Sequence, residues 1–203
     1  IQDEYLTERN IERGITDVAT LTPVKSDSRL YIWQGDITTL KCDAIVNACN
    51  SQMLGCFSPM HACIDNFIHT YAGVELRLKM HEIMTKQGYE EETGKAKITS
   101  GYNLPAKYVL HTVGPIIQWK VTREDENLLA SCYKECLKLA ADTGVESIAF
   151  CCLSTGVFRF PQQRAAEIAT ETVMQFLKKD DRIKKVIFNV FKNEDLEIYS
   201  HLL

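Results

Sequence analysis

The sequence lacks the features that mark several large classes of protein. No segment comes near the roughly 18 to 20 consecutive uncharged apolar residues that a membrane-spanning helix needs. Neither an internal repeat nor a low-complexity tract is present in the 203 residues. Positive charge is not in excess either, because the formal net charge is −4. We therefore expect no association with membranes, and nucleic acid is an unfavoured partner because no strong basic field surrounds the chain.

Cysteine, in contrast, is plentiful, with eight residues in the chain. Cys151 and Cys152 are neighbours in an apolar run, and Cys132 and Cys136 are one helical turn apart. A chain long enough to bury a sizeable core rarely needs disulfides, and these placements do not suit them. We expect reduced thiols and a cytoplasmic protein.

The pattern of apolar residues from Leu30 onward is typical of an α/β protein, because short apolar runs alternate with longer amphipathic stretches. Strands are expected at residues 30–33, 44–46, 98–102, 108–113, 147–153 and 185–191, and helices at 63–86, 124–143, 161–179 and 194–203. Thr122 and Asp125 predict a capping box at the start of one helix, and Gly144 predicts its end. Residues 1–28 are mixed, with a short helix expected at 3–13. We expect an N-terminal extension (1–28) and one core domain (29–203).

Ligands of open α/β sheets bind beyond the carboxyl ends of the strands, and polar residues follow the first two predicted strands. Asp36, in the segment 35–38, can accept hydrogen bonds from an exocyclic amine or a ribose hydroxyl, although a tight turn explains it equally well. Asn47 and Asn50 follow a buried strand, where unpaired amides are costly. They either tie loops together or, in the case of Asn50, contact a ligand.

The next loop places Cys56, His61 and Cys63 within eight residues. Two thiolates and an imidazole suit Zn²⁺, and three protein ligands leave a fourth tetrahedral position open, as in catalytic sites. The alternative is a loop with two buried thiols and an unrelated histidine. Asp65 follows the last of these residues and begins a helix, one turn before His69. It is either an N-cap or a group that acts as a base or orients a water or ribose hydroxyl.

Two further segments have the character of binding loops. Ser154, Thr155 and Gly156 precede a helix, where backbone N–H groups can hold a phosphate and Arg159 can add a charged contact. A plain strand-to-helix loop is the alternative. Phe191 ends the last apolar run, where it either stacks on a base or packs into the core.

In combination, these motifs resemble the macrodomain family. The resemblance rests on residues 35–38, 43–50, 64–69, 108–115 and 154–158, in that order, and runs from about Leu30 to the C-terminus. It implies a three-layer α/β/α fold with a central mixed, mostly parallel sheet. Many macrodomain hydrolases carry a run of glycines before the residue that matches Asp65. This chain has residues 56–63 there, which look like the Cys, His and Cys that zinc-dependent macrodomains of microbes supply to zinc.

The resemblance also implies roles for individual residues in an ADP-ribose site. Asp36 would read the adenine amine with the backbone of Ile37 beside it, and Phe191 would lie along the adenine face. Asn50 and Asp65 would be the catalytic residues, near the distal ribose and next to zinc. The diphosphate and the remaining ligand contacts would be held by Asn47, Ser154, Thr155, Gly156, Val157, Phe158 and Arg159. Arg159 and Phe160 depart from the Gly-aromatic pair that the family often has there.

The activity implied is zinc-dependent hydrolysis that removes mono-ADP-ribose from modified proteins, with an O-linkage to Asp or Glu. ADP-ribose would be the product. The resemblance points to a lipoylated glycine-cleavage-H-like carrier, modified by a sirtuin-type transferase, as a substrate. Three alternatives stay open: a module that binds ADP-ribose without turnover, a hydrolase of small metabolites such as O-acetyl-ADP-ribose, and a redox-sensing thiol protein.

Overall fold

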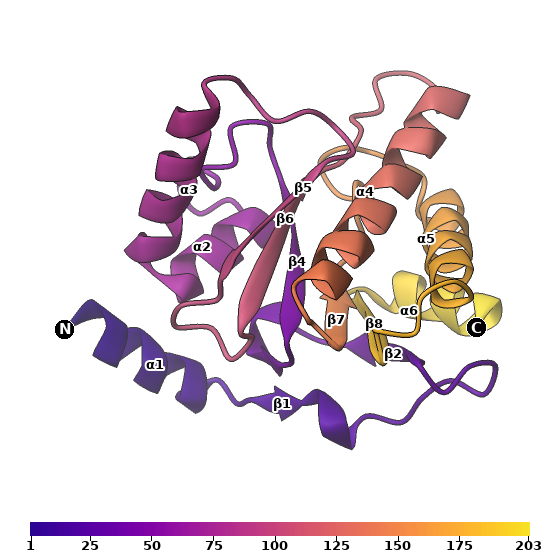
Figure 1. Ribbon diagram of the computed structural model, residues 1–203, viewed down its shortest axis with the longest axis horizontal. Coiled ribbons are helices and arrows are strands. Elements are labelled where there is room, and N and C mark those ends of the chain that lie inside the picture. Colours follow the sequence, from indigo (N-terminus) through magenta and orange to yellow (C-terminus); the bar gives the residue numbers. More distant parts are fainter.

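The computed structural model describes residues 1–203 and contains a six-stranded sheet between two groups of helices (Figure 1). The strands lie in the order β2-β8-β7-β4-β6-β5, and only β5 runs antiparallel to its neighbour. Their bounds are β2 (Leu30–Gln34), β4 (Ala44–Cys49), β5 (Ala96–Ser100), β6 (Tyr108–Val113), β7 (Ser147–Phe150) and β8 (Lys185–Val190). The mixed, mostly parallel sheet expected from the sequence is confirmed.

The inner strands are mostly apolar because helices cover both faces of the sheet. Ala44, Ile45 and Val46 of β4 are fully buried, and every residue of β7 is buried. Such continuous apolar runs are typical of parallel strands between two helical layers. Asn47 is the exception in β4, since its amide is buried in the same layer. A buried amide in this position needs partners, and these form part of the candidate site.

Two helices, α2 (Ile64–Ala72) and α3 (Val74–Gln87), lie on one face of the sheet, and α4 (Arg123–Asp142) and α5 (Gln162–Leu177) lie on the other (Figure 1). The last helix, α6 (Asn193–Leu202), packs against α5, β2 and β8. The capping box of Thr122 and Asp125 is confirmed, and Gly144, with φ 79°, follows the end of α4.

Several expected boundaries are wrong. The strand expected at 44–46 continues to Cys49, so Asn47 lies within the strand and does not follow it, and the strand expected at 98–102 spans Ala96–Ser100. The single helix expected over 63–86 is broken at Gly73, whose φ of 96° is a conformation that favours glycine. A Cβ atom there would also lie 3.0 Å from the Leu6 and Asn103 side chains. The strand expected to reach residue 153 ends at Phe150, since the chain turns away from the sheet at Cys151.

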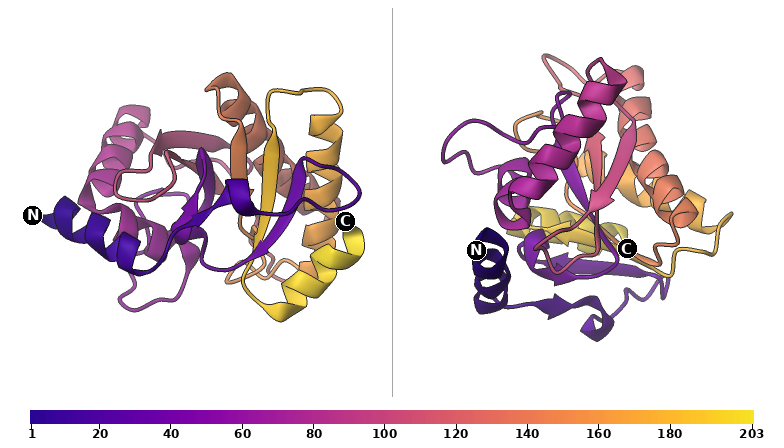
Figure 2. Two further views of the ribbon diagram at one scale, coloured as in Figure 1. Left: turned by 90° about the horizontal axis from the view of Figure 1, so that it is seen from below. Right: turned by 60° about the vertical axis from the view of Figure 1, so that its left-hand side comes forward.

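The N-terminal extension folds onto the core. Its helix α1 (Gln2–Glu12) contacts α2 and lies beside it in Figure 2, and the short strand β1 (Thr16–Asp17) pairs in parallel with β3 (Leu40–Lys41). Asn10 is 3% exposed and donates from Nδ2 to the backbone oxygens of Tyr71 (3.2 Å) and Asn103 (2.7 Å). These bonds attach α1 to the layer that contains α2.

None of the helices has the length and apolar character needed to cross a membrane. All eight cysteines are free thiols. Burial raises the pKa of Cys42 and Cys151 to about 12 and that of Cys132 to about 11. These three buried thiols therefore stay protonated near neutral pH and are poor redox sensors. The cytoplasmic location stays a prediction.

Candidate active site and metal-binding loop

Four of the predicted binding segments meet at one edge of the sheet. Asp36 follows β2, Phe191 follows β8, residues 154–159 follow β7, and the loop of residues 50–63 follows β4. Because β2, β8, β7 and β4 are parallel neighbours in that order, their carboxyl ends and the loops beyond them form one row. This edge is where open α/β sheets bind their ligands.

The loop after β4 brings together the side chains of Cys56, His61 and Cys63. Their ligand atoms lie within 4.8 Å of one another, and Cys56 Sγ is 3.4 Å from His61 Nδ1. With Zn–S and Zn–N bonds of about 2.3 and 2.0 Å, tetrahedral zinc needs S···N and S···S separations of about 3.5 and 3.8 Å. The cluster therefore fits zinc in spacing and in donor chemistry. His61 is exposed and the two cysteines are half-buried, so an added ligand can reach the open position.

Few contacts hold this loop. Asn66, from the first turns of α2, donates to the backbone oxygen of His61 at 3.0 Å and to that of Ser58 at 3.4 Å. Gly55 begins the loop with φ 84°, and a Cβ atom there would lie 2.8 Å from the His69 ring. The loop thus enters over His69 through a position that only glycine fits.

Beneath the loop lies a buried polar network centred on Asp65. This carboxylate is 4% exposed, and its Oδ1 accepts a hydrogen bond from Asn47 Nδ2 at 2.8 Å. Its Oδ2 accepts no hydrogen bond from the chain, which leaves that oxygen for a water or a ligand hydroxyl. His69 Nε2 lies 3.6 Å from Asp65 Oδ1, and neither ring nitrogen of His69 has a hydrogen-bond partner.

The network continues from Asn47 to the neighbouring strand. Asn47 and His111 are register partners in β4 and β6, and Asn47 Nδ2 lies 3.2 Å from His111 Nδ1. An amide nitrogen can only donate, so His111 Nδ1 accepts and the ring proton is on Nε2. That nitrogen lies 2.9 Å from Thr99 Oγ1, to which it donates. Asn47 is fully buried, so its side chain lies under the site and supports Asp65.

Burial is the main cause of the pKa shifts in this network. It raises the pKa of Asp65 to about 6, while the hydrogen bond from Asn47 and the charge of Arg77 act in the other direction. Burial also lowers the pKa of His69 to about 4, assisted by Arg77, and that of His111 to about 3. Both imidazoles are therefore neutral at neutral pH, when they can accept as well as donate hydrogen bonds.

The loop after β7 presents backbone donors. The N–H groups of Gly156, Val157 and Phe158 make no hydrogen bond within the chain. Ser154 and Arg159, on either side, have positive φ values of 64° and 60°, which curl the backbone between them. Consecutive free N–H groups of this kind are able to hold an anion, as the sequence predicts for this loop.

The row ends at Asp36 and Phe191. Phe191 is 77% exposed, so it is available to stack on a planar ligand and is not a core residue. Ile37 is 1% exposed, backbone included, so the backbone contact with the adenine that the sequence predicts has almost no accessible surface. Asp36 caps the short helix η2 (Ile37–Thr39) and forms an ion pair with Arg13 of the N-terminal extension. At the other end, Asn50 accepts from Gln52 N at 3.0 Å and donates weakly to Gly55 O at 3.4 Å. These bonds shape the candidate metal-binding loop, residues 55–63.

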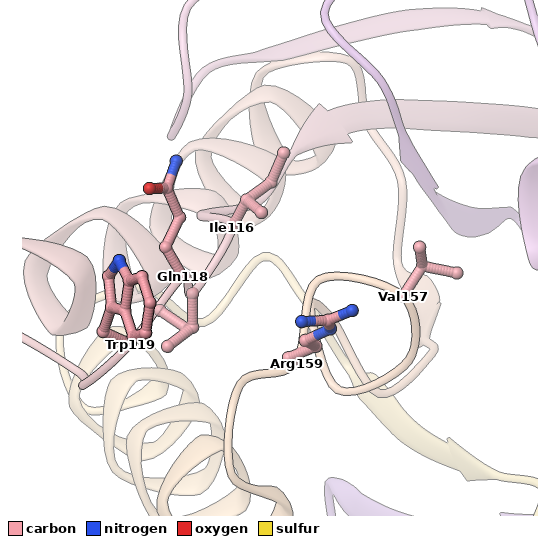
Figure 3. A pocket seen from close by; sticks show the side chains of 6 residues that line it. Ile116, Gln118, Trp119, Val157 and Arg159 are labelled. Atoms are coloured by element: carbon pink, nitrogen blue, oxygen red, sulfur yellow. The ribbon is translucent and has the colours of Figure 1, made fainter.

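A cavity of about 490 Å³ opens beside the loop after β7 (Figure 3). Val157 and Arg159 line it from one side, and the segment after β6 lines it from the other, with Ile116, Gln118 and Trp119. Trp119 is 96% exposed and Ile116 is 60% exposed, and Arg159 has no ion-pair partner. The cavity is therefore mainly apolar with one free positive charge.

Comparisons with known proteins identify the family to which this fold belongs. The family model described as Macro domain matches residues 46–169. The chain belongs to the macrodomain family. A protein-ADP-ribose hydrolase of Treponema medium is 58% identical over 205 residues, which span 100% of this chain and 78% of that protein. One of Staphylococcus aureus (strain MRSA252) is 55% identical over 201 residues, covering 98% of this chain and 75% of the relative.

Solved macrodomain structures share the fold. The Trypanosoma brucei macrodomain in complex with ADP-ribose superposes with a TM-score of 0.79 at 33% identity, covering 93% of this chain and 76% of that one. The Oceanobacillus iheyensis macrodomain with ADP gives a TM-score of 0.75 at 38% identity, covering 85% and 88%. The segment matched by the family model contains the metal-binding loop, Asp65 and the loop after β7, while Asp36 and Phe191 lie outside it.

Sequence reasoning missed four contributors to this macrodomain site. Asn66 holds the metal-binding loop, His111 supports Asn47, Trp119 lines the cavity, and Arg13 pairs with Asp36. One signal was present for His111, because it is a polar residue inside an apolar run, just as Asn47 is. Arg13 gave no such signal, since its partner lies 23 residues away in another element.

Proposed function

We propose that this macrodomain is a zinc-dependent hydrolase that removes mono-ADP-ribose from modified proteins, where it is linked by an ester to Asp or Glu. The observation that carries the proposal is the zinc-compatible cluster of Cys56, His61 and Cys63 directly before the buried carboxylate of Asp65. The relatives described as protein-ADP-ribose hydrolases, which align with nearly the whole chain, support the reaction class.

The row of loops is suited to ADP-ribose because each part of the ligand meets a matching group. Phe191 offers an exposed ring and Asp36 a carboxylate to the adenine, and the free N–H groups of residues 156–158 suit the diphosphate. The distal ribose then reaches the loop after β4, since β4 is next to β7 in the sheet. This orientation brings C1″ and its acceptor towards Asp65 and the metal-binding loop.

The reaction consumes one water. The ester bond between the distal ribose and the acceptor breaks, the acceptor carries away a carboxylate, the ribose gains a hydroxyl, and a proton is released. When bound, zinc would supply Lewis acidity and positive charge at the distal ribose. Asp65 Oδ2, which is free of hydrogen bonds from the chain, holds and orients the water or a ribose hydroxyl. Asn47 keeps the carboxylate in place through Oδ1.

The first test is turnover on a defined set of substrates. Purified protein is given proteins that carry mono-ADP-ribose on Asp or Glu, on Ser or on Arg, together with O-acetyl-ADP-ribose, and released ADP-ribose is measured. Preferential release from Asp or Glu supports the proposal. Binding of ADP-ribose without release from any protein identifies a reader module, and faster turnover of O-acetyl-ADP-ribose identifies a metabolite hydrolase. A lipoylated glycine-cleavage-H-like carrier, suggested by the resemblance alone, belongs in the same panel.

A further inference from the structure

Arg13 lies at the carboxyl edge of the sheet although it belongs to the N-terminal extension, outside the segment matched by the family model. Its side chain is only 13% exposed. One guanidinium nitrogen, Nη2, pairs with Asp36 Oδ2 and also donates to Thr38 Oγ1 at 2.9 Å. The Thr38 hydroxyl in turn donates to Asp36 Oδ1 at 2.6 Å. The three side chains thus form a closed ring of hydrogen bonds.

Arg13 itself is fixed from two other directions. Its guanidinium carbon lies 3.4 Å from the centre of the Tyr71 ring, a cation–π contact with α2. Its Nη1 donates to Asn10 Oδ1 at 3.1 Å, and Asn10 is attached to the backbone of Tyr71 and Asn103. Contacts with α1 and α2 therefore hold the guanidinium in addition to its bonds with Asp36 and Thr38.

The ring leaves Asp36 with one free acceptor position. A carboxylate has about four lone-pair sites. Two on Oδ1 are used by the amide and hydroxyl of Thr38, at 2.9 and 2.6 Å, and one on Oδ2 is used by Arg13. The remaining site is on Oδ2, and the side chain is 36% exposed. A ligand therefore meets one free lone pair of Asp36 Oδ2, which points in a fixed direction. This lone pair can accept one N–H group of the ligand, and its negative charge repels a carbonyl oxygen.

We propose that Arg13 is a positioning residue for base recognition: it orients Asp36 so that the site accepts a 6-amino purine and rejects a 6-oxo purine. The proposal rests on the proposed function, because it assumes that ADP-ribose binds with its base near Asp36. It gives the N-terminal extension a role in ligand selection. Without Arg13, the carboxylate is anchored through Oδ1 alone and turns about its bond to Cβ, so its free acceptor no longer has one direction.

The test compares binding of ADP-ribose with binding of its hypoxanthine analogue, inosine diphosphate ribose, by calorimetry. The variants are Arg13→Gln and, as a matched control on the same helix, Arg9→Gln, since Arg9 is half-exposed and pairs only with Glu12. We expect the unsubstituted protein and Arg9→Gln to prefer ADP-ribose. Arg13→Gln should bind ADP-ribose about tenfold more weakly and lose most of the preference. Loss of folding alone would weaken both ligands equally, so the ratio of affinities reports positioning.

A second variant tests the support from α2. Tyr71→Leu removes the ring under the guanidinium without touching Asp36, and it should reduce the same ratio to a smaller extent. An unchanged ratio in Arg13→Gln, or tighter ADP-ribose binding, would overturn this inference while leaving the proposed function in place. Failure of the unsubstituted protein to bind either nucleotide would overturn both.

Discussion

The metal-binding loop and the carboxylate that follows it two residues later are built in opposite ways. Cys56, His61 and Cys63 lie on an exposed or half-exposed loop that few hydrogen bonds hold. Asp65 is buried and is held through Asn47 and His111 by strands of the core. Under the proposed function a bound zinc ion would order the loop, whereas folding alone places the carboxylate. Substitutions in the loop should therefore change the metal content with little effect on stability. Substitutions in the buried network around Asp65 should affect both turnover and folding.

The largest expected effect is that of Asp65→Asn on turnover. Asparagine keeps an oxygen for Asn47 but cannot act as a base or carry negative charge towards the water. We expect kcat to fall by about 10² to 10⁴ with zinc content unchanged. Thermal unfolding should show equal or greater stability, because a buried charge without an ion-pair partner has been removed. Activity within threefold of the unsubstituted protein would contradict the role given to Asp65.

Cys56→Ser should separate metal binding from stability. The substitution removes a thiolate from the cluster, so we expect loss of bound zinc and a fall in activity of about 100-fold. The midpoint of thermal unfolding of the metal-free protein should hardly change, since the loop contributes little to the core. Cys42→Ser is the matched control, because Cys42 is buried beyond the opposite end of β4, away from the cluster. This variant should keep its bound zinc and its activity. Equal zinc content in both variants would refute the assigned ligands.

The buried network predicts how the stability of the metal-free protein depends on pH. The pKa of His111 is about 3 and that of His69 about 4, both below the ordinary 6.5. As pH falls below 6.5, these two imidazoles take up protons in the unfolded chain but not in the folded one, so the folded state loses stability. Asp65 has the opposite effect: its pKa is raised from 3.8 to about 6, so between these pH values it takes up a proton in the folded chain first and adds stability. The loss from two imidazoles is larger than the gain from one carboxyl group, so stability is greatest above pH 6.5 and declines below it.

We therefore expect the free energy of unfolding to decrease by about 2 to 3 kcal/mol from pH 6.5 to 4.5 in the presence of a chelator. Urea titrations at several pH values measure it. His111→Asn should have a smaller pH dependence, whereas the exposed His81→Asn should match the unsubstituted protein. The same pH dependence in all three would show that His111 is not held in its neutral form.

The smallest effect is expected for Phe191, at the end of the row of loops where we propose that the adenine binds. Phe191→Ala removes an exposed ring that supports nothing in the core. ADP-ribose should bind about five- to tenfold more weakly through lost stacking, and zinc content and unfolding should stay unchanged. Calorimetry on Phe191→Ala beside Phe191→Tyr, which keeps the ring, measures this contribution. Unchanged affinity in the alanine variant would place the base elsewhere.

Local patterns in the sequence predicted the elements well because periodicity and capping are local properties. The capping box at Thr122 and the strand-helix alternation both appear as expected. The break at Gly73 was missed because one glycine inside an amphipathic run is compatible with a continuous helix, and only its contacts with Leu6 and Asn103 show the crowding.

The candidate site was predicted in part for the same reason. Residues 56–63 lie on one loop, so their spacing along the chain already reports their proximity. The partners of Asp36 and Asn47 come from other elements: Arg13 from the N-terminal extension and His111 from β6. No spacing along the chain encodes these contacts, since they depend on the register of β4 with β6 and on how α1 packs against α2.

The most direct test of the account pairs metal content with turnover on a protein modified at Asp or Glu. Zinc per chain is measured, and release of ADP-ribose is followed before chelation, after chelation and after zinc is added back. We expect about one zinc per chain, loss of activity on chelation and recovery on zinc addition, with Cys56→Ser showing no recovery. Full activity in protein free of zinc would contradict this expectation and would leave the chemistry to Asp65 and its buried network alone.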